Sequence, residues 1–129
     1  MNNESNPIVK KSFEFAIQVV KAYKFLCNEQ KEFVLSNQLL RSGTSIGANV
    51  KEAVRAETKA DFIHKMQIAL KEASESEYWI ELLEQTDYFN DKQARILLEK
   101  CREVIRLLTS IIVTAKKSIT LKKNAAKEK

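Results

Sequence analysis

Glycine and proline are scarce in this chain of 129 residues, which contains two glycines and one proline. A β-rich domain of this size normally needs more turn-forming residues, so the composition disfavours an all-β fold. The proline, Pro7, comes near the start of the chain, where it can occupy the first turn of a helix. The near-absence of both helix-breaking residues from the rest of the sequence predicts a few long helices.

Cysteines and long apolar runs are also scarce. Cys27 and Cys101 lie far apart and form no CxxC pair, so we interpret them as free thiols in a reducing compartment. The N-terminal residues MNNESNPIVKK lack the apolar segment of a signal peptide. No apolar run approaches the length of a membrane span. We therefore expect a cytoplasmic protein that does not contact a membrane.

Residues suited to catalysis or metal binding are few. His64 is the only histidine, whereas a di-iron bundle site needs a Glu-x-x-His motif on each of two helices. Two cysteines and one histidine are too few for a conventional structural zinc site. The sequence also lacks a nucleophile elbow and any local signature of a cysteine protease. We therefore predict a protein that is not an enzyme and that carries no metal or cofactor.

Helical periodicity is the dominant pattern that the sequence does contain. Apolar residues recur every three or four positions in four segments, at about residues 7–27, 31–56, 59–85 and 91–118. Thr58 and Asn90 are suitable N-caps for the last two segments. Because the links are short, neighbouring helices must run antiparallel. The sequence predicts an all-α, up-down-up-down four-helix bundle at residues 1–118, followed by a basic tail at residues 119–129 that frays.

Both glycines fall in the stretch RSGTSIGANV, residues 41–50. A phosphate-binding loop would require a GxxxxGK[ST] or GxGxxG motif after a strand, and neither is present. Helical spacing instead continues across the stretch. A glycine inside a helix costs about 1 kcal/mol relative to alanine. We therefore expect close packing at Gly43 and Gly47, against a backbone or one of the bulky residues Phe13, Phe15, Phe62 and Trp79.

The excess of positive charge lies at the C-terminal end. The formal net charge is +5, and residues 116–129 account for all of it with six lysines and one glutamate. Residues 59–87 hold seven acidic and three basic residues, whereas residues 91–117 hold three acidic and seven basic residues. These charges can pair within one molecule, join copies in an oligomer, or leave the basic helix free for a polyanion.

Two segments resemble a known family: LLRSGTSIGANVKEA, residues 39–53, and DFIHKMQIALKEASESEYWIELL, residues 61–83. The family comprises small four-helix-bundle proteins encoded in intervening sequences of bacterial large-subunit ribosomal RNA genes. Many relatives have proline at the position of Gly47 and glycine at that of Ala53. The matching positions are Arg41, the run Ser45-Ile46-Gly47-Ala48-Asn49-Val50, Glu52, Phe62, Ile68, Ala69, Ser74 and Glu77.

The resemblance implies a homo-oligomer, with a ring-like pentamer expected, and nucleic-acid binding as in some relatives. Related proteins are accessory factors of retroelement reverse transcriptases, which implies a polymerase-type partner as an alternative. The polar family positions Arg41, Asn49, Glu52 and Glu77 also have a structural interpretation. A partly buried Glu77 needs a cation or hydrogen-bond donors. We predict that Arg41 or Asn49 supplies them, in a polar network that fixes the helix register.

Two non-enzymatic functions are compatible with these features. In the first, an oligomer binds RNA or DNA through phosphate contacts that do not read sequence. In the second, the bundle is a scaffold for a protein such as a reverse transcriptase or other polymerase, and the lysines serve only solubility or steering. We favour the first. Its candidate contact residues are Arg95, Arg102, Arg106, Lys116, Lys117, Lys122 and Lys123.

Overall fold

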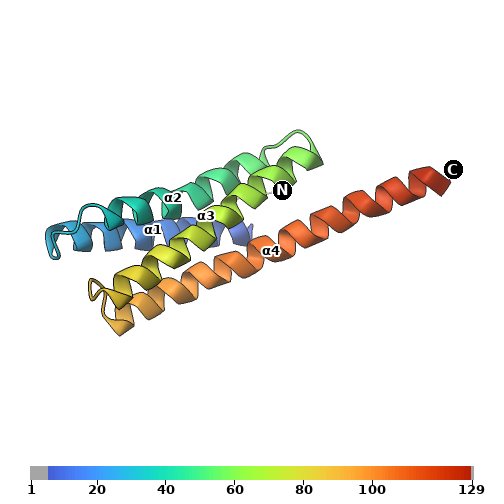
Figure 1. Cartoon of the computed structure of the whole chain (residues 1–129). Coiled ribbons are helices and arrows are strands. Elements are labelled where there is room, and N and C mark those ends of the chain that lie inside the picture. The colour runs from blue at the N-terminus through green and yellow to red at the C-terminus, as the bar shows by residue number, and fades with distance from the viewer. Residues whose placement is uncertain (1–5, 129) are drawn as a thin grey trace.

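The computed structural model describes residues 6–128, and over this range it consists of helices joined by short links, without a strand (Figure 1). The helices are α1 (Pro7–Asn28), α2 (Leu35–Val54), α3 (Lys59–Gln85) and α4 (Asp91–Glu128). Each helix packs against its neighbours in the sequence, and α1 also packs against α4, which closes the bundle. The predicted antiparallel four-helix bundle is therefore confirmed.

Local capping explains where the helices begin. Pro7 opens α1, and the Asn6 side chain accepts a hydrogen bond from the backbone N–H of Ile8 at 3.1 Å. The hydroxyl of Thr58 caps α3 by accepting from the N–H of Asp61 at 3.1 Å. At the start of α4, Asn90 and Gln93 form a reciprocal capping box with distances of 2.8 and 2.9 Å.

Helix α2 is shorter than the sequence predicts. It begins at Leu35 rather than near residue 31, because Lys31 has a φ of 52° and cannot be part of a right-handed helix. The Glu32 carboxylate then accepts hydrogen bonds from the N–H groups of Val34 at 3.3 Å and Ser36 at 2.8 Å. An acidic side chain thus satisfies the free donors at the start of this helix.

Gly43 and Gly47 lie inside α2, so the helical interpretation of residues 41–50 is confirmed. A Cβ atom at Gly43 would lie 2.7 Å from Cγ2 of Val19 on α1, whereas one at Gly47 would lie 3.5 Å from Oγ of Ser12. Close packing is therefore confirmed at Gly43, but the residue at Gly47 has room for a methyl group. The nearest atoms are those of the Val19 side chain at Gly43 and those of Ser12, including its backbone carbonyl, at Gly47. None of the predicted aromatic residues makes the closest contact, although Phe13 lines the same hollow as Gly47.

The core runs the length of the bundle and receives side chains from all four helices, including Phe15, Ile46, Met66, Ile80 and Leu108. Along α4 the apolar residues at helical spacing from Ala94 to Ala115 are buried, except that Ile105 is half-buried while the neighbouring Val104 is buried. The last buried residue of α4 is Ala115.

Helix α4 does not end near residue 118 as the sequence predicts, but continues to Glu128. Residues 116–128, which we call the C-terminal arm, project beyond the other three helices (Figure 1). At a rise of 1.5 Å per residue the arm is about 20 Å long. Its side chains from Thr120 to Lys127 are all exposed. Fraying of the tail stays a prediction, and Lys129 lies outside the described residues.

Candidate nucleic-acid interface

The predicted contact residues all lie on α4, and all seven are exposed. An α-helix turns about 100° per residue, so residues seven apart share one face. Arg95, Arg102, Lys116 and Lys123 follow this spacing, and Arg106 lies beside them. Lys127 lies on the same face although it is not among the contacts predicted from the sequence. It is 21 residues, or three seven-residue steps, after Arg106, and this spacing is the signal that identifies it.

We call Arg95, Arg102, Arg106, Lys116, Lys123 and Lys127 the basic stripe. It extends over about 48 Å of helix, from the start of α4 to the end of the arm. Two predicted residues do not lie within it. Lys117 lies at its edge, and Lys122 lies on the far side of the helix. The structure therefore aligns most of the predicted contact residues but not all of them.

One stripe residue is held by neighbouring carboxylates. The Nε–H of Arg102 donates to Oε2 of Glu77 at 2.8 Å, and its NH2 nitrogen is 3.6 Å from Oε1 of Glu81. The hydrogen bond to Glu77, together with the charges of both carboxylates, raises the pKa of Arg102. The predicted pairing of α3 with α4 within one molecule therefore occurs at Arg102.

The rest of the basic stripe has no such partner. Between residues 6 and 127, no carboxylate lies within 4.0 Å of a basic nitrogen of Arg95, Arg106, Lys116, Lys123 or Lys127. The sequence contains no acidic residue between Glu103 and Glu128. Most of the positive charge on α4 therefore faces solvent and is available to an anion outside the molecule.

The four residues of the predicted polar network do not form one network. Arg41 pairs with Glu72, at 3.2 Å, and with Glu75, both on α3. Glu77 pairs with Arg102 rather than with Arg41 or Asn49. The reason is geometric: Glu77 is five residues after Glu72, which places it on the side of α3 that faces α4 instead of α2.

The other two residues of that set have local partners. The side-chain amide of Asn49 donates to the carbonyl oxygen of Ser45 at 2.8 Å, within α2. The Glu52 carboxylate lies 3.0 Å from Nζ of Lys65 on α3. Arg41 and Arg102 therefore act separately, and each attaches a neighbouring helix to α3.

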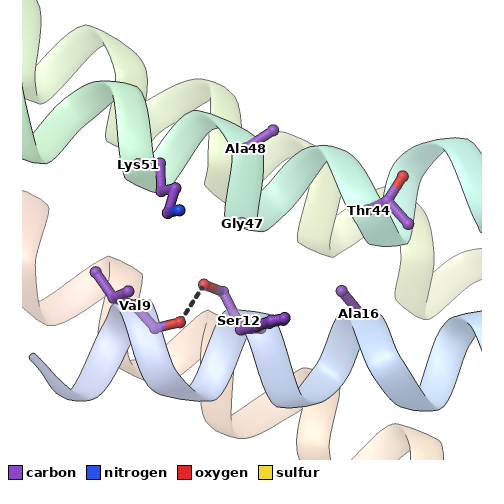
Figure 2. A pocket seen from close by; sticks show the side chains of 8 residues that line it. Val9, Ser12, Ala16, Thr44, Gly47, Ala48 and Lys51 are labelled. Carbon is purple, nitrogen blue, oxygen red and sulfur yellow. Dashed lines mark hydrogen bonds between the residues drawn. The ribbon is translucent and has the colours of Figure 1, made fainter. Parts of the chain in front are cut away.

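A second surface, between α1 and α2, is apolar. A hollow of about 290 Å³ lies there, and Gly47 and Ala48 of α2 form one wall opposite Ser12 and Ala16 of α1 (Figure 2). Phe13 beside it is 57% exposed, and Ile17, one turn further along α1, is 43% exposed. This α1–α2 groove continues into a further hollow of about 430 Å³, which Lys51 and Arg55 border. The paired hollows can receive apolar side chains from another molecule.

Aromatic residues at the end of α3 mainly cover the core. Phe89 is buried and stacks on Phe25 with ring centroids 6.5 Å apart. Trp79 and Tyr88 are half-buried against the core, and only Tyr78 is largely exposed. Of the two roles that these residues suggest, covering the core end or forming an interface, the first accounts for all but Tyr78.

Two further features of the described residues concern metal ligands and membrane-spanning helices. Within the described residues, no group of three or more His, Cys, Asp or Glu side chains is arranged to hold a metal ion. His64 is exposed on α3. Among the helices that the structure describes, none combines the length and apolar character needed to cross a membrane.

Comparisons with known proteins agree with the fold and the motifs. A family model described as 23S rRNA-intervening sequence protein matches residues 4–110. A solved structure from the S23 ribosomal protein family of Bacteroides thetaiotaomicron VPI-5482, a protein of unknown function, is 56% identical with a TM-score of 0.81. The match covers 81% of this chain and 97% of that chain. No curated protein matches significantly. The resemblance seen in the sequence is confirmed, whereas the relation to retroelement accessory proteins stays a prediction.

Proposed function

The chain belongs to the 23S rRNA-intervening sequence protein family, and from this premise we propose that it binds RNA or DNA in the cytoplasm without reading sequence. The protein is not an enzyme in this proposal. Its side chains contact phosphates, which supply affinity but carry no sequence information directly. The observation that carries the proposal is the basic stripe, whose arginines and lysines other than Arg102 face solvent without a carboxylate partner between residues 6 and 127.

Self-association is the second part of the proposal. Phe13 and Ile17 expose apolar surface beside the α1–α2 groove, and burial of this surface between copies would stabilise an oligomer. The family resemblance favours a pentamer. In a closed oligomer the basic stripe recurs once per copy. A nucleic acid that reaches two stripes then binds with an avidity above that of either stripe alone.

A protein-binding scaffold is the alternative function. The α1–α2 groove that favours self-association can equally receive an apolar segment of another protein, such as a reverse transcriptase or other polymerase. In this alternative the basic stripe accelerates encounter with the partner and does not bind nucleic acid tightly.

Fluorescence anisotropy with labelled RNA and DNA, measured across a salt series, tests the proposal. The full chain is compared with residues 1–115, which retain every residue that is buried in the described part of the chain. We expect both forms to bind, with an affinity that falls steeply as salt rises. The truncated form should bind more weakly, because it lacks Lys116, Lys123 and Lys127.

The possible results separate the two functions. Binding by both forms places the interface on α4 within the bundle as well as on the arm. Binding by the full chain alone assigns it to the lysines of the arm and contradicts a role for Arg95 and Arg106. If neither form binds at low salt, the nucleic-acid proposal is wrong and the scaffold is the better account. Analytical ultracentrifugation of Phe13→Ser, which should dissociate the oligomer, tests the proposed self-association.

A further inference from the structure

The basic stripe has a geometry that differs from that of a single-strand binding site. Its residues lie along one face of an uninterrupted helix, so the charges form a row of about 48 Å. Proteins that hold single strands combine basic residues with aromatic side chains on which unstacked bases lie. Helix α4 contains no phenylalanine, tyrosine or tryptophan. The stripe therefore offers phosphate contacts but no stacking surface.

The charge density of the nucleic acid then decides the affinity. Double-stranded DNA carries about one phosphate per 1.7 Å of axis, twice the density of either strand alone. Each phosphate that is neutralised on a duplex also releases more condensed counterion than one on a single strand. The logarithm of the binding constant falls with the logarithm of the salt concentration by about 0.9 per contact on a duplex and about 0.7 on a single strand. A row of cations without aromatic residues should therefore bind a duplex more tightly.

The C-terminal arm extends this row beyond the part of the chain shared with the family. The family match ends at residue 110, and the arm begins at Lys116. Lys116, Lys123 and Lys127 continue the stripe, and the arm's side chains from Thr120 to Lys127 are all exposed. At its base the arm is fixed, because Nζ of Lys59 on α3 donates to Oγ of Ser118 at 3.1 Å. The bundle thus sets the direction in which these lysines point.

We infer that α4 and its arm bind the phosphate backbone of double-helical nucleic acid in preference to single strands, with the arm laid along the duplex by its stripe face. This inference rests on the proposed function. Duplex RNA and duplex DNA present the same phosphate chemistry, and the experiment below shows which of the two the protein binds more tightly.

The test measures anisotropy of the full chain with four labelled probes at about 0.1 M salt: duplex DNA, duplex RNA, oligo-dT and oligo-U. Each probe is about 20 nucleotides long per strand, which exceeds the length of the stripe. We expect the duplexes to bind about tenfold more tightly than the single strands. Tighter binding of either duplex than of both single strands supports the inference, and the ratio of the two duplex affinities shows which duplex is preferred.

Two charge-reversal variants test whether the stripe face of the arm contacts the duplex. Lys122 and Lys123 are adjacent, but only Lys123 lies on the stripe. Lys123→Glu should weaken duplex binding by about tenfold and lower the salt slope by about one unit. Lys122→Glu changes the net charge equally but should weaken binding less than about threefold.

The results distinguish failure of this inference from failure of the proposed function. Single strands that bind as tightly as duplexes overturn the duplex preference but leave nucleic-acid binding intact. Equal losses in Lys122→Glu and Lys123→Glu overturn the stripe orientation and indicate that only total charge matters. If none of the four probes binds, both the inference and the proposed function are wrong.

Discussion

The hydroxyl oxygens of Ser42 on α2 and Ser76 on α3 lie 2.9 Å apart, and both residues are fully buried. Ser76 has a second partner, the carbonyl oxygen of Glu72 at 2.9 Å. The second partner of Ser42 is the Leu39 carbonyl oxygen, at the longer distance of 3.4 Å. The two serines therefore satisfy each other where α2 and α3 pack together, and Ser42 depends on the pair more than Ser76 does.

Replacement of these serines should therefore have unequal effects. Ser76→Ala leaves Ser42 with one long hydrogen bond and should lower the free energy of unfolding by about 1–2 kcal/mol. Ser42→Ala leaves Ser76 bonded to Glu72 and should cost only about 0.5–1 kcal/mol. Urea unfolding of both single variants and the double variant measures the coupling. A cost for Ser42→Ala that equals or exceeds that of Ser76→Ala would contradict this account.

The two glycines of α2 should respond oppositely to alanine. At Gly43 the new Cβ would meet Cγ2 and Cγ1 of Val19 at 2.7 and 2.8 Å, so the α1–α2 contact must open. Overpacking costs about 1–3 kcal/mol, which exceeds the gain of about 1 kcal/mol in helix propensity. We expect Gly43→Ala to lower the melting temperature.

Gly47→Ala provides the matched control, because its new Cβ would be 3.5 Å from Ser12 Oγ, an ordinary contact. This variant should gain up to about 1 kcal/mol from helix propensity. The additional substitution Val19→Ala should reduce the harm of Gly43→Ala by removing both Cγ atoms. Equal melting temperatures for the two glycine variants would show that the approach of Val19 does not limit packing.

Much of the fold follows from local features of the sequence. The starts of α1, α3 and α4 agree with the predicted segments because Asn6, Thr58 and Asn90 cap them through contacts within three residues. The sequence places the start of α2 too early, because Lys31 adopts a left-handed φ although no glycine at this position signals it. The sequence predicts an end of α4 near residue 118 because the apolar pattern stops there, whereas the helix continues through the arm with no buried side chain between residues 116 and 127.

The partners of the polar residues could not be predicted in the same way. Helical spacing shows that Glu72 and Glu77 point in different directions from α3, but it does not show which direction faces α2 and which faces α4. That choice depends on the handedness of the bundle, which the apolar pattern leaves open. The exposure of Phe13 has a related cause, because the apolar stripe of α1 is wider than the surface that α2 and α4 cover.

Partial release of Arg102, which keeps its second contact with Glu81, should strengthen nucleic-acid binding. Glu77→Gln removes the carboxylate that accepts from Arg102 at 2.8 Å and adds one unit of positive charge. The side chains are 30% and 49% exposed, so the free energy of unfolding should fall by less than about 1 kcal/mol. Affinity for a nucleic-acid duplex should rise severalfold, as measured by anisotropy.

Glu84→Gln is the control for this release. It changes the net charge equally, but between residues 6 and 127 the Glu84 carboxylate has no ion-pair partner. An equal rise in affinity in both variants would show that net charge alone matters and that Arg102 is not released for binding.

Cys101 should make the protein less stable at alkaline pH. Burial raises the pKa of its thiol from 9.0 to about 12, and Sγ donates to the Ala73 carbonyl oxygen at 3.3 Å. The folded protein therefore holds the proton more tightly than the unfolded chain does. The resulting stability is fully present below about pH 9 and is lost as the pH rises toward about 12.

The substitution Cys101→Ser isolates this effect, because a serine hydroxyl can still donate to Ala73 but does not titrate in this range. Between about pH 8 and about pH 11, the urea midpoint should fall less in Cys101→Ser than in the parent. Cys27→Ser, at the half-buried cysteine, should follow the parent more closely. Identical slopes in all three proteins would exclude a contribution from Cys101.

The C-terminal arm separates the requirements of folding from those of binding. Between residues 116 and 127 no side chain is buried, so the arm can lose a turn, gain one or exchange its lysines without disturbing the interior. Packing of the core therefore does not require the five lysines between residues 116 and 127. Because α4 runs without a break from the interior into solvent, a movement of its buried part also moves the arm. Small rotations of α4 at its base become larger displacements at its tip, so a probe at Ala126 would report changes in packing deep in the bundle.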